Sequence, residues 1–448
     1  MPDRLPVTGI LLVGGASERF GSAKAHAPFR GETLAERAWR ILHVVCDEVF
    51  AVGKADGAEL PFPVFDDGAE ERAPIFGLIA GLRLASNDVC LALPVDVPLI
   101  TPGALRALAA TRTVPQTGPL PGAYPKDALH ELEARVARAE LSIRGVNPLV
   151  LEIDETQLLN VNTRMDLIAA SVADWARERE DVRAVMVVGS QARSDAPADA
   201  WSDLDVVLFV DDPRRLADDE TWVEGFGTPV LTFLESTAFG DRVERRVLYE
   251  SGEDVDFPLL EASGWRELSA SPEAQLLLAR GYRVLHDELG LVEALRDLAP
   301  VADSWPPDAA AFRQLASDFW YHALWTAKKL RRGEVFTALE CLDCYLKRRL
   351  VELLGWHARS LDETVDTWHG GRFLERWADP GALAALERAY AQYDVRDVAR
   401  GLWETIDLWQ GVEEETERRL GLDAGLDRPD LRRRISEVVP DVRTRRAL

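Results

Sequence analysis

Short apolar runs alternate with amphipathic stretches through the first part of the chain. The helical stretches, 34–45 and 74–82, carry apolar residues at three- and four-residue spacing. The runs that predict buried strands are 7–13, 48–52, 62–65 and 89–93. Strands that alternate with helices usually become parallel neighbours, so this pattern predicts a doubly wound α/β domain.

Strand patterns dominate the middle of the chain. The runs predicted as strands are 184–188, 206–210, 230–234, 245–249 and 254–260. A helical stretch at 165–180 precedes them and ends in a charge cluster. It is interpreted either as the join between two modules or as the first helix of the second one.

From about residue 300 the pattern is helical and rich in tryptophan. The predicted helices are 311–332, 335–354, 374–377, 380–393 and 395–420, followed by a short amphipathic helix within 427–448. The aromatic residues are expected to form its core. We therefore predict three domains, with bounds 1–170, 171–298 and 299–448.

Composition narrows the functional classes. The chain has 448 residues and a formal net charge of −24, which disfavours nucleic acid as a partner and favours small-molecule substrates. It shows neither a signal peptide nor an apolar run long enough to span a membrane. Four scattered cysteines predict a reducing, cytoplasmic setting, and the Cys341–Cys344 pair is expected to be buried in a helix. The oligomeric state stays open.

A glycine-rich loop follows the first predicted strand. Gly14 and Gly15 permit a tight turn and a close approach of backbone to phosphate. Ser17 can donate to a phosphate oxygen, and Arg19 and Lys24 supply positive charge where a triphosphate leaving group gathers negative charge. The loop predicts a nucleotide site.

Asp96 follows the predicted strand at 89–93, between two prolines. Open α/β sheets place ligands at the carboxyl ends of their strands. Asp96 is therefore the candidate Mg²⁺ ligand of the first domain, and a helix-capping or turn aspartate is the alternative.

The stretch from Gly189 to Val210 joins two buried-type strands and carries a second candidate site. Asp203 and Asp205 are two residues apart, so a strand places both carboxylates on one face, facing the Gly189–Ser190 turn. Close carboxylates share a proton or bind a hard cation, and the turn offers N–H groups to a phosphate. An Asp-rich loop before a solvated strand is the alternative interpretation of the two aspartates alone.

Asp256 is the predicted third carboxylate of this site. It lies inside an apolar run, where an aspartate without a function is costly. Three carboxylates on adjacent strands suit phosphoryl transfer with two metal ions. Asp256 can share a metal ion or deprotonate an attacking hydroxyl. Strict alternation places Asp254 on the same face.

The first domain resembles the molybdenum cofactor guanylyltransferase group of MobA-like NTP transferases. The resemblance is carried by LLVGGASERFGSAK (11–24), PIFGLIAGL (74–82), LPVDVPLI (93–100) and LLNVNTRMDL (158–167). It implies that the glycine-rich loop and Lys24 hold the phosphates of GTP or CTP and that Asp96 holds Mg²⁺. It also implies that Asn162 lies near the acceptor and the metal. The stretch 49–54 lacks the asparagine that the family often places there to bind guanine, and Asp66 or Asp67 is expected to face the base instead.

The remainder is similar to the aminoglycoside 6-adenylyltransferase (streptomycin adenylyltransferase) family of polymerase-β-like nucleotidyltransferases. The motifs are GSQARSDAPADAWSDLDVVLFV (189–210), WVEGFG (222–227), SGEDVDFPLLE (251–261), YRVLHDELG (282–290), SDFWYHALWTAKKLRRGE (317–334) and GGRFLERW (370–377). The resemblance implies an α+β domain with a helical subdomain. It places Gly189 and Ser190 at the phosphates of ATP, with Asp203, Asp205 and Asp256 at Mg²⁺. It further implies that Lys328 reaches the phosphates and that Asp318 binds the substrate.

These resemblances together predict a Mg²⁺-dependent bifunctional nucleotidyltransferase. The first domain would transfer a nucleotide from GTP or CTP to a phosphorylated acceptor such as molybdopterin. The second would transfer AMP from ATP to a hydroxyl of an aminoglycoside-like molecule. The alternative is that one half is catalytic and the other is a non-catalytic nucleotide sensor that regulates it.

Overall fold

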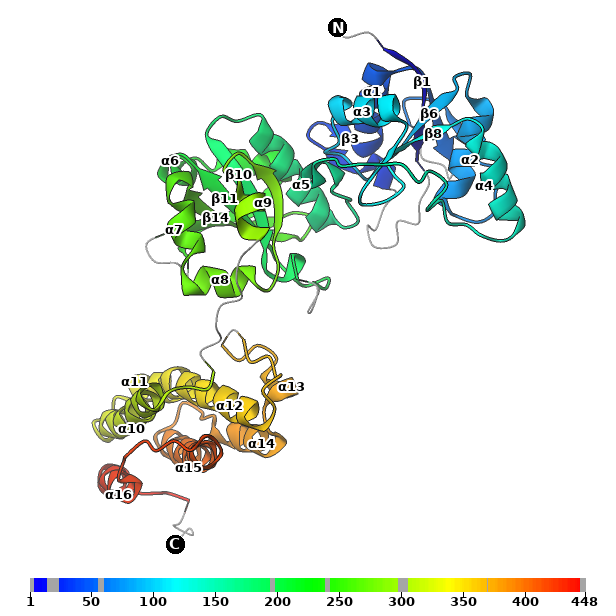
Figure 1. Ribbon diagram of the computed structural model, residues 1–448. Coiled ribbons are helices and arrows are strands. Elements are labelled where there is room, and N and C mark those ends of the chain that lie inside the picture. Colours follow the sequence, from blue (N-terminus) through cyan, green and yellow to red (C-terminus); the bar gives the residue numbers. More distant parts are fainter. Residues whose placement is uncertain are drawn as a thin grey trace. The chain divides into compact units, whose positions relative to one another are not determined.

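The computed structural model contains two large sheets with helices packed on them and a further group of helices, and it describes residues 4–13, 24–54, 60–193, 198–237, 242–296, 305–368 and 370–443 (Figure 1). The chain divides into two units, Met1–Val301 with both sheets and Ala302–Leu448 with the helices. An α/β class with a helical C-terminal region is thereby confirmed.

The first sheet has the strand order β5-β4-β1-β6-β8. Its strands are β1 (Leu5–Leu12), β4 (Cys46–Gly53), β5 (Val64–Asp66), β6 (Val89–Pro94) and β8 (Gly122–Pro125). The first four are parallel, as the alternating pattern predicts, whereas β8 runs antiparallel to β6. The carboxyl ends of β1, β4 and β6 therefore lie at the same edge of the sheet.

Helices cover both faces of this sheet, because the strand residues are apolar on both sides. Leu11 and Leu91 share a core with α1 (Leu34–Val45) and α3 (Pro102–Thr111). Ile10 and Ala92 point the other way, toward α2 (Pro74–Leu84) and α4 (Ala128–Ala137). The doubly wound arrangement follows from this alternation.

The second sheet has six strands in the order β12-β13-β14-β11-β10-β15. They are β10 (Val182–Val188), β11 (Leu204–Val210), β12 (Pro229–Ser236), β13 (Val243–Tyr249), β14 (Asp254–Glu261) and β15 (Arg283–Asp287). Strands β11 and β14 are parallel, and the other neighbours are antiparallel. The first residues of β11, β14 and β15 and the last of β10 consequently share one edge of the sheet.

Short helices complete the second domain. They are α6 (Pro213–Asp218), the 3-10 helix Thr221–Phe226, α7 (Trp265–Ser269), α8 (Pro272–Leu278) and α9 (Leu291–Arg296). Trp265, Leu278 and Leu291 cover one face of the sheet, whereas Trp222 covers the other. This second face also receives the long helix that precedes β10.

That helix, α5 (Arg164–Arg177), lies between the two sheets and belongs to both cores (Figure 1). Its residues 168–173, 175 and 176 are all buried, and a helix buried on every side needs neighbours all round. Trp175 stacks on Trp222 of the second domain at 5.4 Å between ring centroids, while Arg177 donates to the Leu99 carbonyl of the first. The predicted boundary at 170/171 falls inside this helix because both domains use it.

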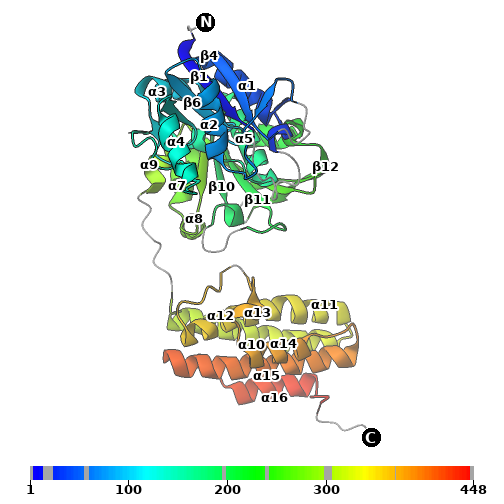
Figure 2. The same ribbon diagram turned by 90° about the vertical axis from the view of Figure 1, so that its right-hand side faces the viewer.

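The helical unit contains α10 (Ala309–Arg331), α11 (Val335–Glu340), a π-helical turn (Cys341–Leu346), α12 (Lys347–Leu361), α13 (Leu374–Trp377), α14 (Pro380–Ala389), α15 (Val395–Leu420) and α16 (Arg428–Val438). Figure 2 shows α10, α12 and α15 side by side. Phe319 stacks on Trp409 at 3.8 Å, and buried Glu413 accepts hydrogen bonds from the indoles of Trp320 and Trp409. These aromatic residues form the core.

Two further features of the chain are the environment of its cysteines and the apolar character of its helices. Of the predicted helix cysteines, Cys341 is buried and Cys344 is exposed. Within the described ranges, no helix combines the length and apolar character that crossing a membrane requires.

Candidate functional sites

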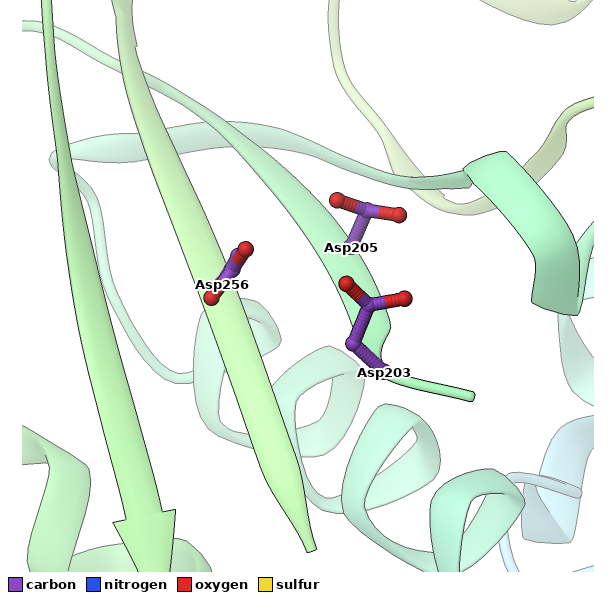
Figure 3. Close-up of side chains that lie close together, drawn as sticks. All are labelled: Asp203, Asp205 and Asp256. Atoms are coloured by element: carbon purple, nitrogen blue, oxygen red, sulfur yellow. The ribbon is translucent and has the colours of Figure 1, made fainter. Parts of the chain in front are cut away.

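Three carboxylates meet at the edge of the second sheet (Figure 3). Asp203, Asp205 and Asp256 each offer an oxygen, and these oxygens lie within 4.8 Å of one another. Because β11 and β14 are parallel and in register, Asp205 lies directly beside Asp256. Asp203 precedes β11 by one residue and is exposed. Among the described residues, this is the cluster with the donor set of a metal site.

Gly189 makes room for this cluster. It follows β10, where Val188 pairs with Asp205, and its φ of +69° lies in the left-handed region. A Cβ atom at position 189 would lie 2.1 Å from a carboxylate oxygen of Asp205. A side chain is therefore excluded both by the backbone conformation and by space.

Ser190 follows in the same turn, and its side chain points into the protein. The residue is buried, yet its hydroxyl oxygen makes no hydrogen bond with any described residue. A buried hydroxyl without a partner is unusual in a folded protein. A phosphate oxygen is the kind of group that would satisfy it.

Burial and mutual repulsion raise the pKa values of two of the carboxyls. Burial, followed by the charges of Asp203 and Asp256, raises the pKa of Asp205 to about 7. Burial also raises the pKa of Asp256 to about 6, although Arg246 opposes the rise. A bound cation would favour the ionised form of both carboxyls and so lower these pKa values, and oxygen donors suit Mg²⁺.

Arg246 is the cation nearest Asp256 and was not predicted from the sequence. Its guanidinium lies 3.3 Å from Asp256 and pairs with Glu244 and Glu235 as well. Strand pairing places it opposite Asp256. The alternation of β13 is the only signal that could have revealed it, and it requires the register with β14. Asp254, in contrast, is exposed and outside the cluster.

A smaller polar site lies at the carboxyl edge of the first sheet. The Lys24 ammonium lies 3.2 Å from an Asp96 carboxylate oxygen and 3.1 Å from the Asn162 amide oxygen. The Val161 N–H donates to the Asp96 carbonyl at 2.8 Å, which fixes the two loops together. The structure thus brings together three residues that are far apart in the sequence. Gly14, Gly15, Ser17 and Arg19 lie outside the described residues.

The two candidates for the base-binding side differ in their contacts. Asp66 ends β5 and is exposed. Asp67 is paired with Lys54 at 2.8 Å, and its side chain is 7% exposed. Asp67 is therefore engaged within the protein, which leaves Asp66 as the residue with an accessible carboxylate.

Two predicted residues lie on α10 of the helical unit. Lys328 is exposed. Asp318 accepts a hydrogen bond from the Tyr345 hydroxyl at 2.9 Å and lies 2.7 Å from Nδ1 of His322. Arg349 lies 3.9 Å from it. Asp318 is thus the centre of a polar cluster, whose other members were not predicted.

Comparisons with known families match the chain in two sections. A model of streptomycin adenylyltransferase matches residues 163–432, and a MobA-like NTP transferase domain matches residues 9–144. The first of these matches begins at the residue that caps α5.

Curated relatives divide in the same way. A probable molybdenum cofactor guanylyltransferase of Chloroflexus aggregans is 32% identical over 196 residues, covering 37% of this chain and 94% of the relative. A molybdenum cofactor guanylyltransferase of Pseudomonas putida is 34% identical over 161 residues, which cover 32% of this chain and 84% of the relative. An aminoglycoside 6-adenylyltransferase of Bacillus subtilis is 22% identical over 276 residues, which cover 54% of this chain and 93% of the relative.

The sheets, their polar edges and these matches define the class of the protein: it is a nucleotidyltransferase. More particularly, the chain belongs to the streptomycin adenylyltransferase family, and its first domain belongs to the MobA-like NTP transferases. The predicted relationship to both families is confirmed.

Proposed function

We propose that the chain is a bifunctional nucleotidyltransferase with one active site in each of its first two domains. The observation that carries the proposal is the cluster of Asp203, Asp205 and Asp256, whose carboxylate oxygens lie within 4.8 Å of one another. Carboxylates this close repel one another unless a cation joins them, and one of them, Asp256, is buried. Their place beside the Gly189–Ser190 turn, whose backbone N–H groups can bind a phosphate, favours a nucleoside triphosphate as the ligand.

In the second domain, a substrate hydroxyl attacks the α-phosphorus of ATP. A new oxygen–phosphorus bond forms, the bond to the bridging oxygen of the β-phosphate breaks, and pyrophosphate leaves. Asp256 is the carboxylate proposed to accept the hydroxyl proton. Gly189 and Ser190 hold the phosphates. Asp203, Asp205 and Asp256 would hold Mg²⁺, which would offset negative charge on the phosphates.

The acceptor of this domain is proposed from the names of the family and its relatives. An aminoglycoside such as streptomycin carries several positive charges, and this chain carries a net charge of −24. Complementary charge speeds the encounter of such partners. Asp318 is the proposed contact to the aminoglycoside, and Lys328 is the proposed contact to the ATP phosphates.

In the first domain, an acceptor phosphate attacks the α-phosphorus of GTP or CTP and pyrophosphate again leaves. The attacking oxygen carries no proton at neutral pH, so no base is required. Lys24 offsets the negative charge that gathers on the leaving group, together with Arg19 of the glycine-rich loop. Asp96 and Asn162 provide oxygen ligands for Mg²⁺, whose remaining ligands would come from the phosphates. The relatives' names make molybdopterin the acceptor to test first.

An assay of pyrophosphate release tests both halves in the full chain. The protein is supplied with ATP and streptomycin, or with GTP or CTP and molybdopterin, each with Mg²⁺ or with a chelator. We expect release in both mixtures and none after chelation. Asp203→Asn should abolish only the release with ATP and streptomycin. Asp96→Asn should abolish only the release with GTP or CTP and molybdopterin.

The same assays test the alternative that one domain is a non-catalytic nucleotide sensor. A domain that binds its nucleotide without releasing pyrophosphate, and whose nucleotide changes the rate of the other domain, would be a sensor. Full adenylyl transfer by Asp203→Asn would contradict the site assigned to the second domain. Full activity of Asp96→Asn would do the same for the first.

A further inference from the structure

The first turn of α5 contacts Asn162 of the first candidate site and two residues of the second domain, Arg283 and Glu253. On one side, an Asp166 carboxylate oxygen accepts hydrogen bonds from the N–H groups of Asn162 at 3.1 Å and Thr163 at 3.0 Å. It also accepts the Thr163 hydroxyl at 2.9 Å. Asn162 in turn accepts from Lys24 at 3.1 Å. Asp166 therefore fixes the backbone that presents Asn162 to the first site.

The other carboxylate oxygen of Asp166 belongs to a contact with the second domain. Both terminal nitrogens of Arg283 lie 3.4 Å from it, and the two side chains are only 32% and 15% exposed. Arg283 begins β15 and pairs with Val187 of β10. Asp166 thus divides its two oxygens between the two domains.

Arg283 is packed close to the turn that carries Gly189 and Ser190. Two residues before it, Gly281 lies so close that a Cβ atom there would be 2.5 Å from the carbonyl oxygen of Ala192. The segment 281–283 therefore rests directly on the backbone that follows the turn. A shift of Arg283 would reach the turn through this contact.

A second contact reaches the carboxylate cluster by another strand. Arg164, in the first turn of α5, lies 3.9 Å from Glu253. Glu253 is buried and precedes Asp256 by three residues, which is roughly 10 Å along an extended strand. The first turn of α5 is thus tied to the strands that begin at the carboxylate edge.

The remainder of α5 offers little freedom to absorb a displacement. It is buried between the two sheets, and Trp175 stacks on Trp222. On the first-domain side, Asp174 pairs with Arg37 and Arg30. The helix that carries Asp166 is therefore held by contacts with both domains.

From these contacts we infer that Asp166 is a positioning residue shared by both active sites, and that its ion pair with Arg283 couples nucleotide binding at one site to nucleotide binding at the other. The inference rests on the proposed function, since it requires a nucleotide in each domain. Coupling of binding free energies is reciprocal, so each nucleotide must change the affinity for the other by the same factor.

The variant Arg283→Gln tests this inference because it removes the ion pair without substituting Asp166, the residue that caps α5. The affinity of the full chain for Mg²⁺–GTP, and separately Mg²⁺–CTP, is measured with and without a saturating non-hydrolysable ATP analogue. The reciprocal titration is made with the same ligands. In the wild-type chain, we expect each nucleotide to change the affinity for the other at least threefold, by the same factor in both titrations. In Arg283→Gln, the affinities with and without the other nucleotide should be nearly equal.

Two further variants separate coupling from a merely structural effect. Arg183→Gln removes an ion-pair network with Asp211 and Glu288 on the same sheet, at the other end of β15 from Arg283, and should keep the wild-type coupling. Arg283→Lys restores a positive charge and should recover part of it. Equal coupling in wild-type and Arg283→Gln chains, or independent binding in the wild-type chain, overturns the inference.

A ligand-free readout distinguishes this outcome from failure of the proposed function. Amide hydrogen exchange at Asn162 and Thr163 reports whether Asp166 is held in place. We expect about fivefold faster exchange in Arg283→Gln and no change in Arg183→Gln. Unchanged exchange in Arg283→Gln overturns the inference whether or not either domain binds a nucleotide, whereas absent nucleotide binding contradicts only the proposed function.

Discussion

The two candidate sites differ in how their charge is balanced within the chain. In the first domain one carboxylate, Asp96, has Lys24 at 3.2 Å. In the second, three carboxylates meet, and the nearest cation, Arg246, also pairs with two glutamates. The first site is therefore close to neutral without a ligand, whereas the second stores repulsion that a bound cation would relieve. The two proposed reactions would thus rest on opposite electrostatic arrangements.

The largest expected effect sharpens this comparison at the second site. Asp256→Asn should lower adenylyl transfer about 10³-fold, since it removes a metal ligand and the proposed base together. Transfer by the first domain should stay within twofold. Steady-state pyrophosphate release with each substrate pair measures both rates.

Asp254→Asn is the matched control for that variant. Asp254 lies on the same strand, two residues earlier, but is exposed and outside the cluster. Its substitution should change adenylyl transfer less than twofold. Similar losses in both variants would show that the strand, and not the carboxylate of Asp256, is what matters.

The corresponding change in the first domain should be smaller. Lys24→Met should lower nucleotide transfer by this domain about 10²-fold, because one positive charge near the leaving group is lost. Adenylyl transfer should be unchanged, and the loss should fall mainly on kcat. A KM effect alone would mean that Lys24 only binds the nucleotide.

Gly189→Ala tests the close approach of the turn to the carboxylates. The new Cβ would overlap Asp205 and force a left-handed alanine, at a cost of about 1–3 kcal/mol in the free energy of unfolding. Adenylyl transfer should fall at least tenfold. Gly252→Ala is the control, since Gly252 has φ +95° and open space around it. A wild-type rate in Gly189→Ala would contradict the assigned geometry.

The smallest expected effect is on stability and depends on pH. The pKa of Asp205 is raised to about 7 in the folded chain, from 3.8 in the unfolded chain, so folded protein retains a proton that unfolded protein loses. The metal-free protein should therefore lose stability as pH rises from 4 to 7. Asp205→Asn should add about 1–2 kcal/mol to the free energy of unfolding at pH 8, and almost nothing near pH 4.

Denaturant unfolding at the two pH values measures this difference. Mg²⁺ should stabilise the wild-type chain at pH 8 and have less effect on Asp205→Asn. A variant that is less stable than the wild type in metal-free buffer at pH 8 would show that the cluster carries no stored repulsion.

Local patterns predicted much of the fold and of both sites. The alternation of side chains along strands was enough to pair Asp203 with Asp205, and the cost of a buried aspartate was enough to select Asp256. Helix α15 has the predicted bounds, because its apolar spacing and its ends are local signals.

Contacts set by register or by domain arrangement were not predictable in this way. Arg246 reaches Asp256 only through the alignment of β13 with β14, and Asp166 reaches Arg283 across 117 positions of sequence. The antiparallel direction of β8 likewise depends on the return of the chain and not on its apolar pattern. The sequence of α5 does not reveal that two domains share this helix, because the contacts of its faces depend on how the domains pack.

Product analysis by mass spectrometry tests the central claim most directly. The full chain is incubated with Mg²⁺, ATP and streptomycin together with GTP, CTP and molybdopterin. We predict two products, an adenylylated aminoglycoside that disappears in Asp256→Asn and a nucleotidylated molybdopterin that disappears in Lys24→Met. An adenylylated product that persists in Asp256→Asn, or both products lost in either variant, would contradict two separate active sites in one chain.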